Sequence, residues 1–317
     1  MRLGCGSLAR RASPRVRYAR PGTVFGAGNG IMSTSTARWT WQGHAVELGV
    51  DRAGAGPAVL LLPALSSIST RKEMEPLAER LADRYRTIAV DWPGFGDRPR
   101  PQVDWTPDAY RAYLAFLLRD VVPMPHAIVA AGHAATYALA QAVRAPGSIN
   151  RLAMIAPTWR GPMPTVAGRK RPIFDRIRRL GDAPVLGQLL YRLNVNGPML
   201  RMMTAGHVYS DKSWLAGDRL TEKLAVTEAP GARFASIRFV LGHLDPLASR
   251  AEWVGLVERA TIPLLLIYGA ETPPRSRAEM EAVADRPQIR TVRVDRGKLS
   301  VHEEFPDEVA DAIRRFL

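Results

Sequence analysis

Histidine and aspartate recur in two short stretches, "GHVYSD" and "GHLDP", which carry His207, His243 and Asp245. These residue types bind transition metals and also transfer protons near neutral pH. A pair of metal ligands on one helix face needs a spacing of four residues, and none of these residues forms such a pair. The single cysteine, Cys5, also excludes a cysteine-based zinc cluster. We therefore predict no metal site and no cofactor, and keep the three residues as polar candidates only.

Apolar runs alternate with helical patterns along the chain, and these are the elements that must position any site. A buried strand is predicted at residues 58–62, a helix at 72–85, and a second apolar run at "RTIAVDW". A helix "PDAYRAYLAFLLRDV", a strand "HAIVAAG", a helix "AATYALAQAVRA" and a strand "INRLAMIAP" follow. This order predicts a doubly wound α/β fold with a mostly parallel sheet.

Several motifs occur in the order found in α/β-hydrolases. The segment "LLLPALSSISTRKEMEPLAERLADRYRTIAVDWPGFGDRPRP" resembles the front half of that fold, in which a strand ends at an oxyanion loop and the next strand ends in D-x-P-G-x-G, here Asp91 to Gly96. "IPLLLIYGAETPP" resembles the strand that carries the family's acid, and "HEEFPDEVADAIRRFL" resembles its final helix. The resemblance covers roughly residues 40 to 317, and it implies an α/β-hydrolase fold with an inserted helical lid.

The same resemblance implies a serine nucleophile in a G-x-S-x-G turn after the strand "HAIVAAG". The aligned residues are "GHAAT", with His133 after the first glycine and Ala134 at the serine position. A methyl group has neither a lone pair nor a transferable proton, so acyl-enzyme chemistry at Ala134 is excluded. The family's residue at the place of His133 usually packs sideways, which favours a structural role for it.

The other two triad positions are also predicted to be vacant. The family's histidine lies seven residues before a proline, and counting back from Pro306 gives Leu299. The acid is expected around Thr272 or Pro273. Two nearby residues are candidate substitutes: Glu271, one place away, and His302, for which a role at the entry of the last helix is the alternative. This pattern predicts a degenerate triad.

The oxyanion loop after the first buried strand is the predicted ligand-binding region. Ser66 and Ser67 in "SSIST" offer hydroxyl and backbone N–H groups to a ligand oxygen, although turn formation is the alternative. Ala64, His133 and Ala135 complete the predicted ligand-binding set. A helical lid at residues 160–259 is expected to give an apolar underside and so an apolar pocket.

The chain divides into three predicted parts. Residues 1–38 are predicted to be an unstructured extension, 39–159 and 260–317 the α/β-hydrolase core, and 160–259 the lid. The first 40 residues carry seven arginines and no acidic residue, half of the net charge of +14. Residues 1–31 resemble an organelle-targeting segment, but a start at Met32 is the favoured interpretation, which predicts a cytoplasmic protein.

The remaining excess charge does not predict nucleic-acid binding. It gathers in "RKRPIFDRIRR", which is typical of the solvated face of an amphipathic helix, and no zinc-finger spacing or basic ribbon with interleaved aromatic residues accompanies it. No apolar run has the length of about 18 to 20 residues that a membrane span needs. The expected partner is a small molecule, and the sequence does not indicate an oligomeric state.

The sequence leaves two classes of function open. The first is a protein that binds a small, largely apolar ligand under the lid and does not hydrolyse it by serine chemistry. The second is an enzyme, either a hydrolase with relocated residues such as His302 and Glu271, or a lyase or isomerase. Convergence of a histidine and a carboxylate beneath the lid would favour the enzyme.

Overall fold

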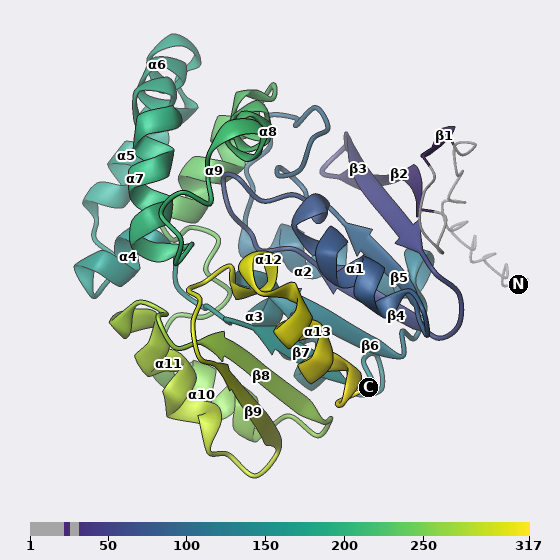
Figure 1. Cartoon of the computed structure of the whole chain (residues 1–317). Helices are drawn as coiled ribbons and strands as arrows, with labels where there is room; N and C mark the ends of the chain where they lie inside the picture. Colours follow the sequence, from purple (N-terminus) through teal and green to yellow (C-terminus); the bar gives the residue numbers. More distant parts are fainter. Residues whose placement is uncertain (1–21, 26–31) are drawn as a thin grey trace, which may run out of the picture.

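A nine-stranded sheet forms the centre of the computed structural model, which describes residues 22–25 and 32–317 (Figure 1). The strand order is β1-β2-β3-β5-β4-β6-β7-β8-β9. The strands are β1 (Gly22–Phe25), β2 (Met32–Trp41), β3 (His44–Ala53), β4 (Ala58–Leu62), β5 (Arg86–Val90), β6 (Ala127–Ala131), β7 (Leu152–Ile155), β8 (Leu264–Gly269) and β9 (Ile289–Val294).

Strands β4 to β9 are parallel to one another, and β1 to β3 add an antiparallel edge, with β3 pairing against β5. Each central strand is a continuous apolar run, such as "AVLLL" in β4 and "AIVAA" in β6, because both faces of a parallel sheet are covered. The doubly wound, mostly parallel α/β fold predicted from the sequence is confirmed.

Helices cover both faces of this sheet. α1 (Glu75–Leu81) and α13 (Pro306–Arg314) lie together over one face, and α2 (Pro107–Phe116), α3 (His133–Arg144) and α10 (Arg250–Glu258) lie behind the sheet (Figure 1). The shorter helical turns are η1 (Arg71–Met74), η2 (Leu117–Val121) and α12 (Val301–Glu304), and α11 (Pro274–Ala284) precedes β9. No helix in the described part of the chain is long and apolar enough to cross a membrane.

The chain between β7 and β8 is helical throughout. It forms α4 (Pro162–Ala167), α5 (Ile173–Asp182), α6 (Pro184–Asn194), α7 (Gly197–His207), α8 (Gly217–Glu228) and α9 (Ala232–Val240) before α10. Helices α4 to α9 stand together beyond one end of the sheet, and α5 to α7 project furthest from it (Figure 1). The sequence predicted helices here.

Three local predictions differ from the structure. Residues 22–25 and 32–38 lie in β1 and β2 rather than in an unstructured extension, because they pair with the next strand along; the remaining residues of the predicted extension lie outside the described ones. The helix predicted at 72–85 ends at Leu81. The predicted last helix is interrupted at Phe305, because Pro306 disfavours a helical conformation in the residue before it.

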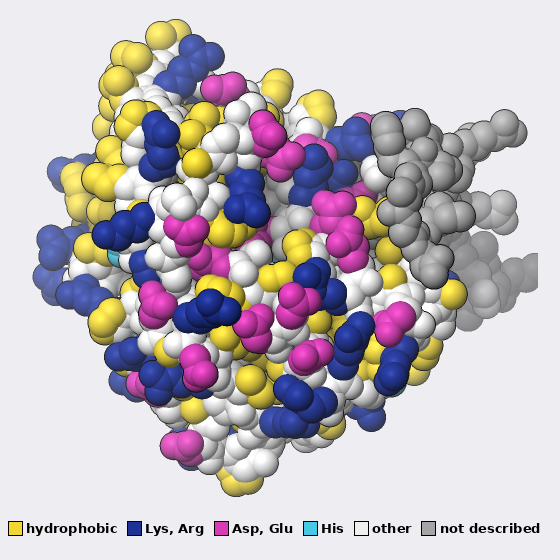
Figure 2. All heavy atoms as spheres, viewed as in Figure 1, with side chains coloured by type: hydrophobic (Ala, Val, Ile, Leu, Met, Phe, Trp, Pro, Cys, Tyr) yellow, Lys and Arg dark blue, Asp and Glu magenta, His cyan; other side chains and the backbone are white. Residues whose placement is uncertain are grey.

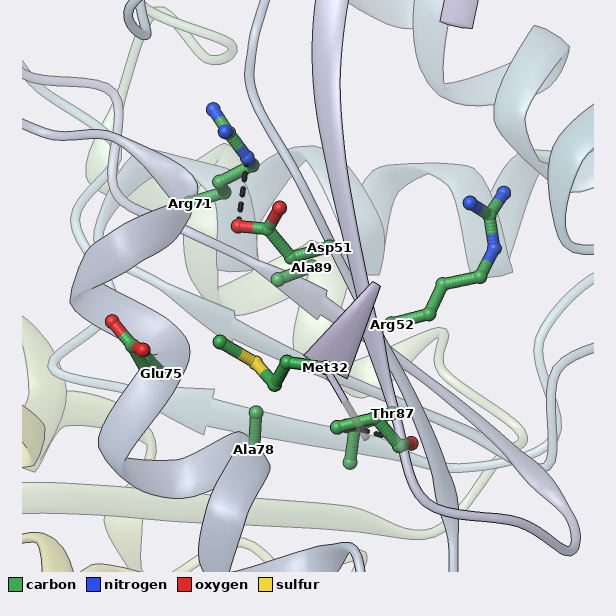
Figure 3. A pocket seen from close by; sticks show the side chains of 9 residues that line it. Met32, Asp51, Arg52, Arg71, Glu75, Ala78, Thr87 and Ala89 are labelled. Carbon is green, nitrogen blue, oxygen red and sulfur yellow. Dashed lines mark hydrogen bonds and ion pairs between the residues drawn. The ribbon is translucent and has the colours of Figure 1, made fainter. Parts of the chain in front are cut away.

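The buried Arg71 forms ion pairs that link the D-x-P-G-x-G turn to the sheet. The Arg71 guanidinium contacts the carboxylates of Asp51 at 2.8 Å, Asp91 at 2.6 Å and Asp97 at 2.9 Å. A β-carbon at Gly96, where φ is +85°, would lie 2.4 Å from the Asp91 side chain, so the turn requires glycine there. Figure 3 shows Arg71 and Asp51 beside a small cavity with room for about 10 Å³, which is too little for a substrate.

Candidate functional site

The carboxyl ends of β4 and β6 meet at the point where the strand order reverses. From β4 the chain moves to β5 on one side, and then crosses back to β6 on the other side of β4. Ligands of open parallel sheets bind in the crevice outside such a switch point. A ligand site is therefore expected beside Ala64 and Gly132, the residues that follow these two strands.

The tight turn between β6 and α3 is centred on Gly132. Its φ and ψ are +54° and −128°, a region that residues with a side chain rarely adopt. A β-carbon placed there would lie 3.3 Å from the Ala64 β-carbon and 3.6 Å from Thr158 Oγ1. Ala134 lies one residue inside α3, and its methyl group is fully buried. The structure thus places the turn two residues before Ala134.

A hydroxyl, an imidazole and a carboxylate form a hydrogen-bonded row beside this turn. His133 Nδ1 lies 2.7 Å from Thr158 Oγ1, and His133 Nε2 lies 3.3 Å from Asp245 Oδ1. Thr158 follows β7, His133 begins α3, and Asp245 lies in the loop between α9 and α10. The imidazole is buried, whereas Thr158 is partly exposed. This is the arrangement of a nucleophile, a base and an orienting acid.

Neighbouring groups hold the imidazole and the carboxylate in place. The Phe239 ring packs edge-on against the His133 ring at 5.1 Å, and Gly161 N–H donates to Asp245 Oδ1 at 2.8 Å. Tyr137, on the same helix as His133, donates its hydroxyl to the Leu244 carbonyl at 2.8 Å, which fixes the loop that carries Asp245. The row is therefore held by contacts on both sides.

The chemistry of the row depends on where the imidazole proton lies. With the proton on Nε2, that nitrogen donates to Asp245, and the bare Nδ1 can accept the Thr158 hydroxyl proton. A secondary hydroxyl activated in this way can attack a carbonyl carbon. The N–H groups of His133 and Ala134 precede the first hydrogen bond of α3, which Ala135 N–H donates to the Gly132 carbonyl, and they lie at the positive dipole end of the helix. This end suits a developing negative charge at the same edge of the sheet.

A second cluster of buried charges lies nearby, below the helices that follow β7. Glu73 Oε1 accepts the Ala64 N–H at 2.5 Å and lies 3.7 Å from His302 Nε2. Glu303 accepts from the Lys223 ammonium at 3.0 Å and from the Tyr209 hydroxyl at 2.9 Å. Both ring nitrogens of His302 are buried without a hydrogen-bond partner. The cluster ties η1 and α12 to α8.

The burial and charges of this cluster shift its titration. Burial alone would raise the pKa of Glu73. Its interactions with His302 and with the Lys223 ammonium outweigh the effect of burial and lower that pKa. Burial favours the neutral amine of Lys223, yet the carboxylates of Glu303 and Glu73 raise its pKa. Burial, followed by the charge of Glu303, raises the pKa of Tyr209. These shifts favour the ionised carboxylate of Glu73, the ammonium form of Lys223 and the neutral hydroxyl of Tyr209.

Three members of this cluster, Glu73, His302 and Glu303, offer ligand atoms within 4.8 Å of one another. That donor set suits a divalent metal. However, the Lys223 ammonium already lies 3.0 Å from Glu303, and a second cation beside it would be repelled. The residues therefore fit an internal ion-pair cluster better than a metal centre.

The remaining residues singled out in the sequence are spread around these two clusters. Leu299 is half-buried and packs against the core, and Thr272 is buried with an unpartnered hydroxyl. Glu271 is exposed, and the carboxylate beside His302 is that of Glu73 instead. In the described part of the chain, His207 Nδ1 pairs with the Met203 carbonyl and His243 Nε2 with Asp175, and neither imidazole hydrogen-bonds to the row.

The predicted ligand-binding set is only partly accessible. Ala64, Ser66 and Ser67 are half-buried, whereas His133 and Ala135 are buried. Of this set, Ala64 and His133 lie beside the Gly132 turn. Sequence reasoning missed Thr158 and Glu73, because a lone threonine after a strand and a glutamate in an amphipathic helix carry no motif.

Comparison with known proteins agrees with the fold. The chain belongs to the alpha/beta hydrolase family, whose model matches residues 59–312. A hydrolase from Pseudomonas aeruginosa superposes with a TM-score of 0.67 at 18% identity, covering 92% of this chain and 99% of that one. A thermophilic esterase from Thermogutta terrifontis gives 0.66 at 20% identity, covering 88% of this chain and 97% of that one.

A curated relative matches a shorter stretch. The 2-(acetamidomethylene)succinate hydrolase of Mesorhizobium japonicum is 36% identical over 88 residues. These residues make up 28% of this chain and 30% of that protein, so the match spans less than a third of the relative's length.

Proposed function

We propose that this chain is a hydrolase that binds a small, largely apolar substrate and cleaves it through Thr158, His133 and Asp245 instead of a serine. The observation that carries the proposal is the hydrogen-bonded row, with 2.7 Å between Thr158 Oγ1 and His133 Nδ1 and 3.3 Å between His133 Nε2 and Asp245 Oδ1. The family and its named relatives, which include hydrolases and an esterase, support a hydrolytic reaction.

The turn conformation supports Gly132, rather than Ala134, as the position that corresponds to the family's nucleophile. Neither residue offers a hydroxyl, so conventional serine chemistry is not expected at either place. Thr158 Oγ1 lies 3.6 Å from where a Gly132 side chain would begin. The hydroxyl of Thr158 thus reaches the space that a serine would occupy, from the neighbouring strand.

The proposed reaction has two steps. Thr158 Oγ attacks the substrate's carbonyl carbon while His133 Nδ1 takes the hydroxyl proton, and the leaving alkoxide departs with that proton. Water then attacks the acyl-threonine, again giving its proton to His133, and the released Thr158 recovers it. Asp245 stays ionised and holds the Nε2–H throughout. The amides at the start of α3 stabilise the oxyanion of each tetrahedral intermediate.

The helices of residues 160–259 act in this proposal as a lid. Asp245 and Gly161, which hold one end of the row, both come from this segment. Ile68 of the loop after β4 packs against Leu200 and Tyr209 from the same segment, so its underside is apolar next to the site. An apolar substrate would take the place of part of this packing.

A binding protein without catalysis is the second candidate. The observation in its favour is that Glu73 already accepts the Ala64 N–H. This amide belongs to the loop that supplies an oxyanion-hole donor in the family, and a carboxylate in that position would repel an oxyanion. In this case the row of Thr158, His133 and Asp245 only braces the lid.

The experiment that separates the two candidates follows acylation by p-nitrophenyl acetate. The substitution Thr158→Ser keeps a less hindered hydroxyl, whereas Thr158→Val keeps the shape and removes the hydroxyl; Thr221→Val is a matched control at an exposed threonine. We expect an acetyl adduct on the peptide containing residue 158 in the wild type and in Thr158→Ser. Thr158→Val should lose it, with turnover lower by about 10² to 10⁴.

Equal turnover in the wild type and Thr158→Val, with no adduct in either, would reject the catalytic proposal and leave the binding protein. An adduct on any serine that the wild-type chain carries near the turn would contradict both. Because Thr158→Val differs from the wild type by one hydroxyl replaced with a methyl group, thermal unfolding of the two proteins serves to separate a folding defect from a chemical one.

A further inference from the structure

Exposed apolar side chains gather on one part of the molecule. Of the twelve large hydrophobic side chains that are exposed in the described residues, eleven belong to α4 to α7; the other is Met124. Figure 2 shows hydrophobic side chains crowded on the projecting helices at the upper left, with basic side chains among and below them. Scattered exposed apolar residues need no explanation, but a group on one part of the surface does.

The exposed residues form continuous helix faces. On α5, Ile173, Ile177 and Leu180 recur at spacings of four and three residues, which places them on one side of the helix. The buried Phe174 of the same helix faces the protein instead. Helix α5 therefore has a packed face and a second apolar face that stays exposed among the described residues.

The longest of these faces is on α6. Val185, Leu189 and Leu193 follow one another at four-residue spacing, with 82%, 55% and 61% of each side chain exposed. Tyr191, on the opposite side, is buried. Helices α5 to α7 project furthest from the sheet, so α6 lies at the periphery of the molecule (Figure 1).

The charge around this face is strongly positive. Residues 160–207 contain nine arginines and lysines and two aspartates, a net charge of +7. The run Arg169, Lys170 and Arg171, between α4 and α5, is exposed. Apolar side chains on one face, flanked by exposed basic residues, are typical of helices that lie in the plane of a membrane interface.

We propose that helices α4 to α7 dock on the surface of an anionic lipid bilayer, with the apolar side chains of α5 and α6 entering the headgroup region. A second copy of this chain is a poorer occupant, because a symmetric contact would bring one +7 segment against another. An anionic bilayer instead attracts each exposed lysine and arginine. This docking is independent of the catalytic proposal.

The test measures co-sedimentation of the full chain with phosphatidylcholine vesicles, with and without phosphatidylglycerol. One variant, Val185→Ser/Leu189→Ser/Leu193→Ser, removes the apolar face of α6. Its matched control is Met124→Ser, at the exposed apolar residue outside these helices. All four side chains are exposed, so the variants should fold, and circular dichroism checks that they do.

A second variant, Arg169→Gln/Lys170→Gln/Arg171→Gln, removes three basic residues. Its control, Arg84→Gln/Arg86→Gln/Arg293→Gln, removes three exposed charges elsewhere. We expect the wild type to sediment with phosphatidylglycerol vesicles but not with pure phosphatidylcholine, and less so at high salt. Each test variant should bind at least about tenfold more weakly, and each control should bind like the wild type.

Two outcomes would overturn the proposal. The first is absence of wild-type binding, or binding that both test variants keep in full, which would assign it to another part of the chain. The second is a dimer in light scattering that the serine variant dissociates while vesicles bind neither protein. That result would assign the apolar face to a second copy.

Discussion

The conformation at Gly132 predicts where a serine can restore a family-type nucleophile. We expect the hydroxyl of Gly132→Ser to be phosphonylated by a fluorophosphonate probe with loss of fluoride, and Ala134→Ser to remain as unreactive as the parent protein. A side chain at residue 132 starts at the sheet edge, 3.6 Å from Thr158 Oγ1. The methyl group of Ala134 is fully buried, so a hydroxyl there would point into the core.

The cost of each substitution follows from the same geometry. At Gly132 a φ of +54° costs a residue with a side chain about 1 to 3 kcal/mol. The contact of 3.3 Å with Ala64 requires a further small shift. At Ala134 an unpartnered buried hydroxyl costs about 1 to 3 kcal/mol. Both variants should therefore unfold at lower temperature, by roughly 2 to 4 °C for each kcal/mol lost.

The assay combines probe labelling with intact-mass measurement, and Gly132→Ala is the matched control. This control has the same backbone strain and the same β-carbon as Gly132→Ser but no hydroxyl. Labelling of Gly132→Ser alone supports the assignment. Stoichiometric labelling of Ala134→Ser, with Gly132→Ser unreactive, would refute the reasoning and restore the G-x-S-x-G alignment of the sequence.

Three further predictions concern the charged groups. Asp245→Asn should lower esterase turnover by about 10² to 10⁴, because an amide can donate to His133 Nε2 and so moves the imidazole proton to Nδ1; pre-steady-state acylation measures this. Arg71→Met should lower the free energy of unfolding in urea by about 3 to 5 kcal/mol, because it leaves buried Asp91 without its cation. The pKa of Glu73 is lowered from 4.5 in the folded chain, so its ionised carboxylate stabilises the fold above pH 4.5, and this stabilisation is lost as the pH falls through the lower folded value. In urea unfolding at a series of pH values, the free energy of unfolding should therefore fall more steeply toward acid pH in the wild type than in Glu73→Gln.

The framework of the fold could be predicted because its signals are local. The apolar run at β4 was predicted with the bounds that the structure has, Ala58–Leu62, since a strand buried on both faces has no polar interruption. The antiparallel edge was harder to delimit. β2 begins at Met32 in "MSTSTARW", where small polar residues pair with β3 across a sheet edge and show no apolar run.

The sequence predicted a tight turn between β6 and α3, but it did not predict which residue lies at the centre of that turn. "GHAAT" and G-x-S-x-G align by their first glycine, which places the nucleophile two residues later. The backbone torsions instead centre the turn on Gly132, because α3 starts at His133 and, of the residues at this turn, only Gly132 has a positive φ. The letters "GHAAT" match only the first glycine of G-x-S-x-G, and the φ and ψ of Gly132 are not contained in the sequence pattern.

The row of Thr158, His133 and Asp245 could not be found from spacing at all. Its members are separated by 25 and 112 residues, and they meet because β6 and β7 are neighbouring parallel strands whose carboxyl ends share one edge. Asp245 reaches that edge only through the loop after α9, held by Tyr137. The sequence named Asp245 as a polar candidate and put His133 in the predicted ligand-binding set with a structural role favoured, without relating the two. The fold brings them together and adds the Thr158 hydroxyl on the other side of the imidazole.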